Sequence, residues 1–207
     1  MGSNDARTLA RALLDLCRSR KLMIATAESC TGGLVAGALT DIPGSSDVID
    51  RGFVTYSNAA KHDLLGVETA TLTTFGAVSK ETAIAMAVGA LEKADVDLAV
   101  SITGIAGPGG AVPGKPVGLV HFGVAARDGR IAHREQRFGA IGRSNVRQRS
   151  VVEALRMLLD LARGPKPPAK AKPTPTAGVH KRVARTPRRA AAGKRVAPKR
   201  VVKPKKT

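Results

Sequence analysis

The chain has 207 residues, of which 43% are hydrophobic, so it is long and apolar enough for one folded domain with a substantial core. Its formal net charge is +18, but residues 1–163 carry 19 Lys and Arg against 16 Asp and Glu, whereas residues 164–207 carry 15 Lys and Arg and no acid. The strong positive charge therefore belongs to the C-terminal segment, and an argument from charge to nucleic acid applies to that segment alone.

The sequence also lacks the features of a secreted or membrane protein. Its first residues contain no apolar signal region, and no run approaches the roughly 18 apolar residues of a membrane span. The cysteines Cys17 and Cys30 form no pattern of spaced pairs that would indicate disulfides. We therefore expect a soluble cytoplasmic protein with reduced thiols and no membrane partner.

The first predicted elements are a helix and a buried strand. Residues 4–20 place apolar side chains at helical spacing, and the apolar run at residues 22–24 predicts the strand. Residues 25–33, which read Ala-Thr-Ala-Glu-Ser-Cys-Thr-Gly-Gly, are expected to form the turn into the next helix. That helix is predicted to start at Thr31 and to end near Asp41.

The turn at residues 25–33 is the first candidate site. A hydroxyl at a strand end, here Ser29, lies at the sheet edge, and the N–H groups that open the next helix can hold an anion or an oxyanion. Gly32 and Gly33 have no Cβ, so a ligand can approach their backbone closely. The alternative is that Ser29 is an ordinary helix cap and that the glycines only form the turn.

A second strand is predicted at residues 48–57, and it brings Tyr56 to its carboxyl end. A short helix follows, capped by Asn58 and carrying Lys61. Open α/β sheets bind their ligands at the carboxyl ends of strands. Tyr56 and Lys61 are therefore expected to face Ser29 if the two strands are neighbours.

A longer helix opens at Ser79, and the strand predicted at residues 96–102 is apolar enough to be central and buried on both faces. In the helix, the buried stripe is expected to be Ile84, Val88 and Leu91, with alanines between them that allow close approach. The strand leads into a glycine-rich loop that begins with Thr103 and Gly104.

This loop, residues 103–110, lacks both the G-x-G-x-x-G order and the Gly-Lys-Ser/Thr of a P-loop, which argues against a dinucleotide or Walker site. Its alternatives are a ligand-binding loop and a flexible connector. Residues 116–126 and 131–138 then flank the turn sequence Arg-Asp-Gly-Arg, which predicts a hairpin and makes the sheet mixed. A final helix from Arg143 completes an α/β domain over residues 1–163.

Residues 164–207 differ completely in composition, because they are rich in Pro, Ala, Lys and Arg and cannot bury enough apolar surface to fold. We expect a disordered basic tail, similar to those of linker histones, that binds nucleic acid without sequence specificity through counterion release. The alternative is a solvated tail with no dedicated partner.

The simplest catalytic arrangement for these residues is a Ser-Lys pair. Ser29 would attack a carbonyl carbon and Lys61 would accept its proton, which requires a lysine pKa well below its usual value of about 10.4. The alternative is that Lys61 is an ordinary surface charge. The histidines are scattered without ligand spacing, so a metal site or a Ser-His-Asp triad has little support, and we expect no cofactor.

Five blocks of the sequence, taken in order, carry a family resemblance: residues 26–33, 52–58 with Lys61, 76–79, 101–110 and 115–118. Together they resemble the CinA carboxy-terminal domain family, whose stand-alone members are nicotinamide mononucleotide deamidases. The resemblance runs from about Leu9 to Leu161. It implies a three-layer α/β/α sandwich with a mixed, mostly parallel sheet, which is usually a homodimer.

The resemblance further implies a metal-independent amidohydrolase that converts nicotinamide mononucleotide to nicotinic acid mononucleotide and ammonia in pyridine nucleotide recycling. Ser29 matches the nucleophile, Lys61 matches the general base, and Tyr56 lies at the site, while Ser57 is the reserve nucleophile. The 5′-phosphate would be held by a glycine-rich loop or a helix N-terminus together with arginine. The candidate substrate-binding residues are Thr31, Gly32, Gly33, Thr103, Gly104, Arg143 and Arg147; for both arginines the alternative is ordinary surface charge.

The sequence departs from the family pattern in two respects. It does not contain the amino-terminal domain of longer CinA proteins, so their nucleotide pyrophosphatase activity is not expected, and the basic tail has no counterpart. Two alternatives to the enzyme remain open: a silent nucleotide-binding sensor, and a nucleic-acid-associated protein that acts through its tail. The presence of both Ser29 and Lys61 favours the enzyme over the sensor.

Overall fold

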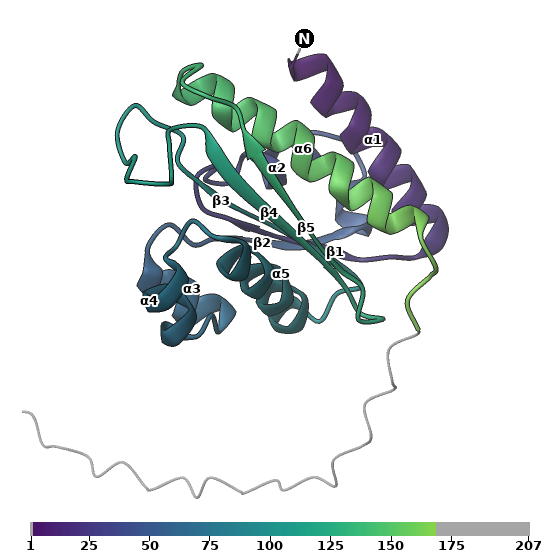
Figure 1. Ribbon diagram of the computed structural model, residues 1–207. Helices are drawn as coiled ribbons and strands as arrows, with labels where there is room; N and C mark the ends of the chain where they lie inside the picture. The colour runs from purple at the N-terminus through teal and green to yellow at the C-terminus, as the bar shows by residue number, and fades with distance from the viewer. Residues whose placement is uncertain (1, 169–207) are drawn as a thin grey trace, which may run out of the picture. The chain divides into compact units, whose positions relative to one another are not determined.

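The computed structural model describes residues 2–168, and it contains six α-helices, one short 3-10 helix and five strands in that range (Figure 1). The prediction of a disordered basic tail concerns residues 164–207, of which 169–207 lie outside the described residues. The elements are α1 (Gly2–Arg20), β1 (Ile24–Glu28), α2 (Leu34–Thr40), η1 (Ser45–Asp47), β2 (Ile49–Val54), α3 (Asn58–Leu65), α4 (Thr69–Phe75), α5 (Lys80–Ala94), β3 (Leu98–Gly104), β4 (Leu119–Ala126), β5 (Ile131–Arg137) and α6 (Arg143–Arg163).

The strands form one sheet in the order β2-β1-β3-β4-β5. β1 pairs in parallel with β2 and with β3, whereas β4 runs antiparallel to both β3 and β5. β4 therefore opposes the other four strands, and the prediction of a mixed, mostly parallel sheet is confirmed. The two strands in the middle of the parallel part, β1 and β3, are almost entirely buried because helices cover both of their faces.

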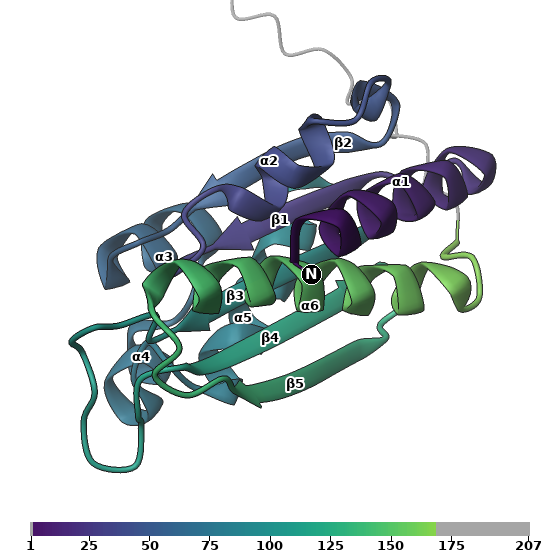
Figure 2. The same cartoon turned by 90° about the horizontal axis from the view of Figure 1, so that it is seen from above.

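Helices lie on both sides of the sheet, with α1, α2 and α6 on one face and α3, α4 and α5 on the other (Figure 1, Figure 2). Alternate residues of β3 point to the two layers. Leu98, Val100 and Ile102 belong to the larger core beneath α1 and α6, whereas Ala99 belongs to a smaller core that includes Met86 of α5. The three-layer α/β/α sandwich is thus confirmed.

Helix α5 packs on the sheet through small residues, and the expected stripe of larger ones was wrong. Ile84, Val88 and Leu91 are only partly buried. The helix turns a different face to the core, and the apolar residues that this face buries are Ala83, Met86, Ala87, Gly89, Ala90 and Ala94. Small side chains were favoured here because the helix backbone lies unusually close to its neighbours.

Two glycines mark this close approach. A methyl group at Gly123 of β4 would stand 2.5 Å from the carbonyl oxygen of Ala83 in α5. A methyl group at Gly89 of α5 would stand 2.0 Å from the carbonyl oxygen of Leu65 in α3. Since real Cβ atoms do not come so near to backbone oxygens, the sheet, α5 and α3 are in contact through their main chains.

Some predicted boundaries were also wrong. β1 continues to Glu28, so the turn is restricted to residues 29–33, and α2 begins at Leu34 rather than at Thr31. Helix α4 was not expected, because its sequence is rich in threonine and has no clear apolar stripe. None of the helices within residues 2–168 combines the length and the apolar character needed to cross a membrane.

Candidate active site

Two connections lie side by side where the parallel strands β1 and β2 end. Ser29 follows β1 directly, and Thr55 and Tyr56 follow β2. The two strands are neighbours in the sheet, and the Thr55 N–H donates to the carbonyl oxygen of Glu28 at 2.8 Å. The expectation that the segment after the second strand faces Ser29 therefore rests on an observed strand pairing.

Lys61 lies on α3, the helix that follows β2, and its side chain extends toward Ser29 at the end of β1. Its side chain is only 1% exposed, and its Nζ lies 3.1 Å from Ser29 Oγ. The same Nζ donates a hydrogen bond of 2.8 Å to the carbonyl oxygen of Thr55. The Thr55 carbonyl thus fixes the amine, and the lysine is buried rather than a surface charge.

Burial changes the acid–base behaviour of this lysine. Removal from water disfavours the charged amine and lowers the pKa of Lys61 from its ordinary value of 10.5, while the neighbouring Cys30 thiol acts in the opposite direction. Burial raises the pKa of Cys30 itself to about 12, so that this thiol stays protonated and is not the nucleophile. A neutral amine beside a hydroxyl can accept the hydroxyl proton.

The N-terminus of α2 is already occupied, and the expectation that it holds an external anion was wrong. The carboxylate of Glu28, which is fully buried, accepts hydrogen bonds from the N–H groups of Gly33, Val35 and Ala36 at 3.0, 3.0 and 2.8 Å. An internal anion therefore satisfies the helix N-terminus. The sequence feature that could have predicted this cap is a glutamate at the end of a strand, shortly before a glycine-containing turn.

The N–H groups of Cys30 and Thr31 differ from those of α2, since they donate to no backbone carbonyl among residues 2–168. Gly32 donates back to the Ser29 carbonyl at 3.1 Å and adopts a positive φ of 60°. The hydroxyl of Thr31 is buried without a hydrogen-bond partner in the described part of the chain. The turn after Ser29 thus offers backbone donors for an oxyanion next to the nucleophile candidate.

Helix α6 brings both predicted arginines to this region. Arg147 donates to the carbonyl oxygens of Cys30 and Thr31 at 3.2 and 2.8 Å, so it holds the turn in place. Arg143 donates to the Tyr56 hydroxyl at 3.0 Å and to the Gly107 carbonyl at 3.2 Å. Neither arginine is an isolated surface charge, and Tyr56, which is 62% exposed, forms the outer rim with Arg143.

Thr103 and Gly104 have structural contacts of their own. Thr103 is buried beside the end of β1, and its hydroxyl donates to the Ala77 carbonyl at 2.7 Å. A methyl group at Gly104 would stand 2.7 Å from the Leu119 carbonyl oxygen, so this glycine allows β3 and β4 to pack. The Thr103 hydroxyl forms no hydrogen bond with Ser29 or Lys61.

The reserve nucleophile, Ser57, has a different environment. Its exposed side chain accepts a hydrogen bond of 3.0 Å from the Ala60 N–H, and it caps α3. The assignment of this cap to Asn58 was therefore wrong by one residue. No basic side chain contacts Ser57 Oγ within the described residues.

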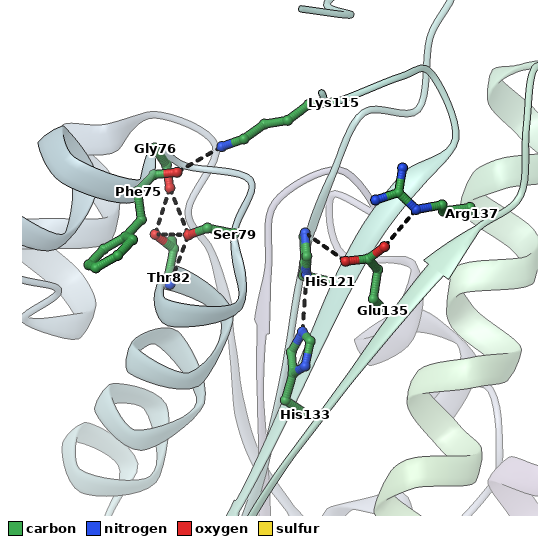
Figure 3. Close-up of polar contacts among 9 residues, drawn as sticks. All are labelled: Phe75, Gly76, Ser79, Thr82, Lys115, His121, His133, Glu135 and Arg137. Atoms are coloured by element: carbon green, nitrogen blue, oxygen red, sulfur yellow. Dashed lines mark hydrogen bonds and ion pairs between the residues drawn. The ribbon is translucent and has the colours of Figure 1, made fainter. Parts of the chain in front are cut away.

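Two histidines that appear scattered in the sequence lie together on β4 and β5 (Figure 3). His121 Nδ1 is 3.0 Å from His133 Nε2, and His121 Nε2 is 3.9 Å from a carboxylate oxygen of Glu135. Desolvation lowers the pKa of both histidines. Cross-strand register makes this pair, which sequence spacing does not show, but residues 5–168 contain no group of three or more His, Cys, Asp or Glu suited to a metal ion.

Comparison with known proteins adds the family context. The model of the CinA C-terminal domain family matches residues 6–162 of this chain. A protein of Enterobacter agglomerans named nicotinamide-nucleotide amidohydrolase PncC is 54% identical over 136 residues, which cover 66% of this chain and 82% of that protein. A CinA-like protein of Mycolicibacterium gilvum is 53% identical over 135 residues, but these cover 65% of this chain and only 32% of the longer protein.

Solved structures agree with the architecture. The competence/damage inducible protein CihA of Agrobacterium tumefaciens is 57% identical and superposes with a TM-score of 0.75, over 76% of this chain and 95% of that one. A CinA superfamily protein of Escherichia coli is 36% identical with a TM-score of 0.73, over 78% and 93% of the two chains.

Proposed function

Since the chain belongs to the CinA C-terminal domain family, we propose that it is an amidohydrolase that converts nicotinamide mononucleotide to nicotinic acid mononucleotide and ammonia. The 54% identity to the Enterobacter agglomerans amidohydrolase supports the substrate class. The chemistry is carried by one observation, the distance of 3.1 Å between the Nζ of buried Lys61 and Ser29 Oγ. We further propose that the reaction serves the recycling of pyridine nucleotides.

In the first half of the reaction, neutral Lys61 takes the proton of the Ser29 hydroxyl while Oγ attacks the carboxamide carbon of the substrate. The carbonyl oxygen becomes an oxyanion, and the N–H groups of Cys30 and Thr31, which follow Ser29 in the chain and donate to no backbone carbonyl, would stabilise it. Lys61 then gives its proton to the departing nitrogen. The C–N bond breaks, ammonia leaves, and an ester joins Ser29 to the nicotinoyl group.

In the second half, water attacks the ester and Lys61 takes a proton from it. The ester bond breaks, the proton returns to Ser29 Oγ, and nicotinic acid mononucleotide leaves. The sum is one amide and one water converted to one carboxylic acid and one ammonia, with no external acid or base consumed. The Thr55 carbonyl holds Nζ in place through both halves, because its hydrogen bond of 2.8 Å does not involve the transferred proton.

The substrate phosphate is proposed to lie at the outer rim beside Arg143. Arg147 already donates two hydrogen bonds to the turn after Ser29. Arg143 instead donates to the Tyr56 hydroxyl at the exposed edge of the site. The α2 N-terminus is not available to the phosphate, since the Glu28 carboxylate fills it and would repel a second anion.

The test is ammonia release from nicotinamide mononucleotide by the purified full chain, in the presence of a chelator. We expect turnover by the wild type and near silence of the Ser29→Ala and Lys61→Ala variants, with the chelator having no effect. An inactive wild type that still binds the mononucleotide would instead identify a nucleotide sensor. Loss of activity on chelation would contradict the metal-independent mechanism.

A further inference from the structure

A cavity lies away from Ser29, between helix α6, strand β5 and the start of α1. Its volume is about 680 Å³, within the range of ligand sites in proteins, and it shares no lining residue with the candidate active site. Figure 2 shows α6 with α1 on one side and the β4-β5 hairpin on the other. The sequence motifs and the proposed reaction leave this cavity unexplained.

The cavity is distinguished by its arginines. Of the arginines in residues 5–168, only Arg11, Arg149 and Arg156 form no hydrogen bond or ion pair, and two of these three line the cavity. Other arginines of the described chain are engaged, as Arg134 is with Glu153 and Arg137 is with Glu135. Arg149 and Arg156 therefore present guanidinium groups that no protein anion satisfies.

The geometry of α6 separates these arginines from those of the active site. Successive residues of an α-helix turn by about 100°, so Arg149 and Arg156 lie almost in line and two turns apart, roughly 10 Å along the axis. Arg143 and Arg147 lie on the opposite side of the same helix, where they reach Tyr56 and the Ser29 turn. One helix thus carries two arginine pairs that face different sites.

The rest of the lining suits an apolar ring and its polar edge. Phe138, Ile141 and Val152 supply apolar surface, and Gln148 is one of the amides beside them. Of the two acidic side chains in the lining, Glu153 is already paired with Arg134 and so does not neutralise Arg149 or Arg156. Asp5, the remaining acid in the lining, can accept a hydrogen bond from a ribose hydroxyl.

We propose that this cavity is a second, non-catalytic binding site for a nucleoside diphosphate. Arg149 and Arg156 lie on one face of α6 and both line the cavity, so their long side chains can converge on a ligand with two neighbouring phosphates, which guanidinium groups bind through paired hydrogen bonds. The apolar wall receives the base. This inference does not depend on the proposed amidohydrolase activity.

The test is calorimetric titration of the full chain with ADP at about 150 mM salt, where weak surface attraction is screened. We expect saturable binding of one ADP per chain, and binding weakened about tenfold or more in the Arg149→Ala/Arg156→Ala double variant. Arg11→Ala is the matched control, since it removes the third unpartnered arginine from neighbouring α1 outside the cavity, and it should bind ADP as the wild type does. Adenosine, which lacks phosphate, should bind far more weakly than ADP.

Competition separates this cavity from the active site. In the Ser29→Ala background, ADP should still bind in the presence of saturating nicotinamide mononucleotide. Displacement by the mononucleotide would overturn the proposal, because ADP would then occupy the active site. Equal ADP affinity in the double variant, or no saturable binding, would overturn it as well. Thermal melting of the double variant and of Arg11→Ala checks that they fold, which is expected because all three arginine side chains are exposed.

Discussion

Ser29 and Ser57 both lie in connections from adjacent parallel strands to helices, but Ser29 directly follows β1, whereas Ser57 directly precedes α3 as its N-cap. The Ser57 oxygen accepts a hydrogen bond from the Ala60 N–H of α3. Ser29 caps no helix, since the Glu28 carboxylate accepts the N–H groups at the start of α2, and the Ser29 oxygen faces the amine of Lys61. A serine oxygen that accepts a helix N–H is engaged and is less available to attack a substrate. Because the Glu28 carboxylate binds the N–H groups of α2, the Ser29 hydroxyl is available for chemistry.

The strongest way to break this comparison is to remove Ser29. Ser29→Ala should lower the rate of ammonia release by about 10³-fold or more, because the nucleophile and its base act as one unit. Retained activity in Ser29→Ala, combined with loss in Ser57→Ala, would exchange the roles of the two serines.

A substitution of Lys61 tests whether this side chain is the base that activates Ser29. Lys61→Arg should reduce kcat by about 10²- to 10⁴-fold, since a guanidinium stays protonated and cannot accept the serine proton. Affinity for the mononucleotide, measured by titration of the variant, should change much less than kcat. A variant with the wild-type rate would show that no neutral amine is needed at this position.

The pH profile sharpens the same point without a substitution. Because burial lowers the pKa of Lys61 below 10.5, the neutral amine exists at lower pH than in free lysine, and kcat/KM should rise with pH to a plateau reached below that value. Activity should fall about tenfold per pH unit below the lowered pKa, as the amine becomes protonated. A rate independent of pH across this range would argue against Lys61 as the base.

The same pKa shift affects stability in a defined direction. The unfolded chain binds the Lys61 proton more tightly than the folded chain does, so this group's contribution to the free energy of unfolding increases with pH between the lowered pKa and 10.5. That contribution is lost as pH falls through the lowered pKa. Lys61→Met should remove this part of the slope in denaturant titrations at several pH values.

Glu28→Gln tests the hydrogen bonds between the Glu28 carboxylate and the N–H groups at the start of α2. The amide keeps the size of the side chain but not its charge, so the three N–H groups of α2 lose a charge-assisted acceptor. We expect a loss of about 2 kcal/mol in the free energy of unfolding and a fall in kcat that exceeds any change in KM. Unchanged stability in a chemical denaturation series would show that the carboxylate charge is not what holds the turn.

Ser57→Ala should give the smallest effect and completes the comparison. Loss of an N-cap costs about 1 kcal/mol, and ammonia release should stay close to the wild-type rate. Thermal melting measures the first quantity and the amidase assay the second. A catalytic loss as large as that of Ser29→Ala would remove the distinction between the two serines.

Much of the fold followed from local patterns in the sequence. The hairpin turn, the glycine after α3 and the long stripe of α6 each specify their own structure, so the mixed sheet and its flanking helices could be predicted. Ser29 and Lys61 could be paired because the order of parallel strands brings their carboxyl ends to one edge. The residues that escaped prediction depend on contacts between distant segments.

Thr55 and the histidine pair are examples of contacts that gave no sign in the sequence. The Thr55 contact is made by a carbonyl group, which every residue carries, so its identity gives no sign of the role. His121 and His133 meet through cross-strand register, which spacing along the chain does not reveal. The inward face of α5 was misjudged because hydrophobicity ranks Ile84 above Ala83, whereas the main-chain contact admits only the smaller side chain.

The main-chain contacts at Gly123 and Gly89 set the precision of the site. Ser29 follows a strand of the sheet and Lys61 lies on α3, and α5 lies between the sheet and α3 and touches each of them backbone to backbone. These backbone contacts involve no side-chain rotamers, so rotamer changes in this layer do not alter the distance between the sheet and α3. Two residues that have no side chain and touch neither reactive group therefore help to hold α3 against the sheet, and the Thr55 hydrogen bond then places the base 3.1 Å from the nucleophile.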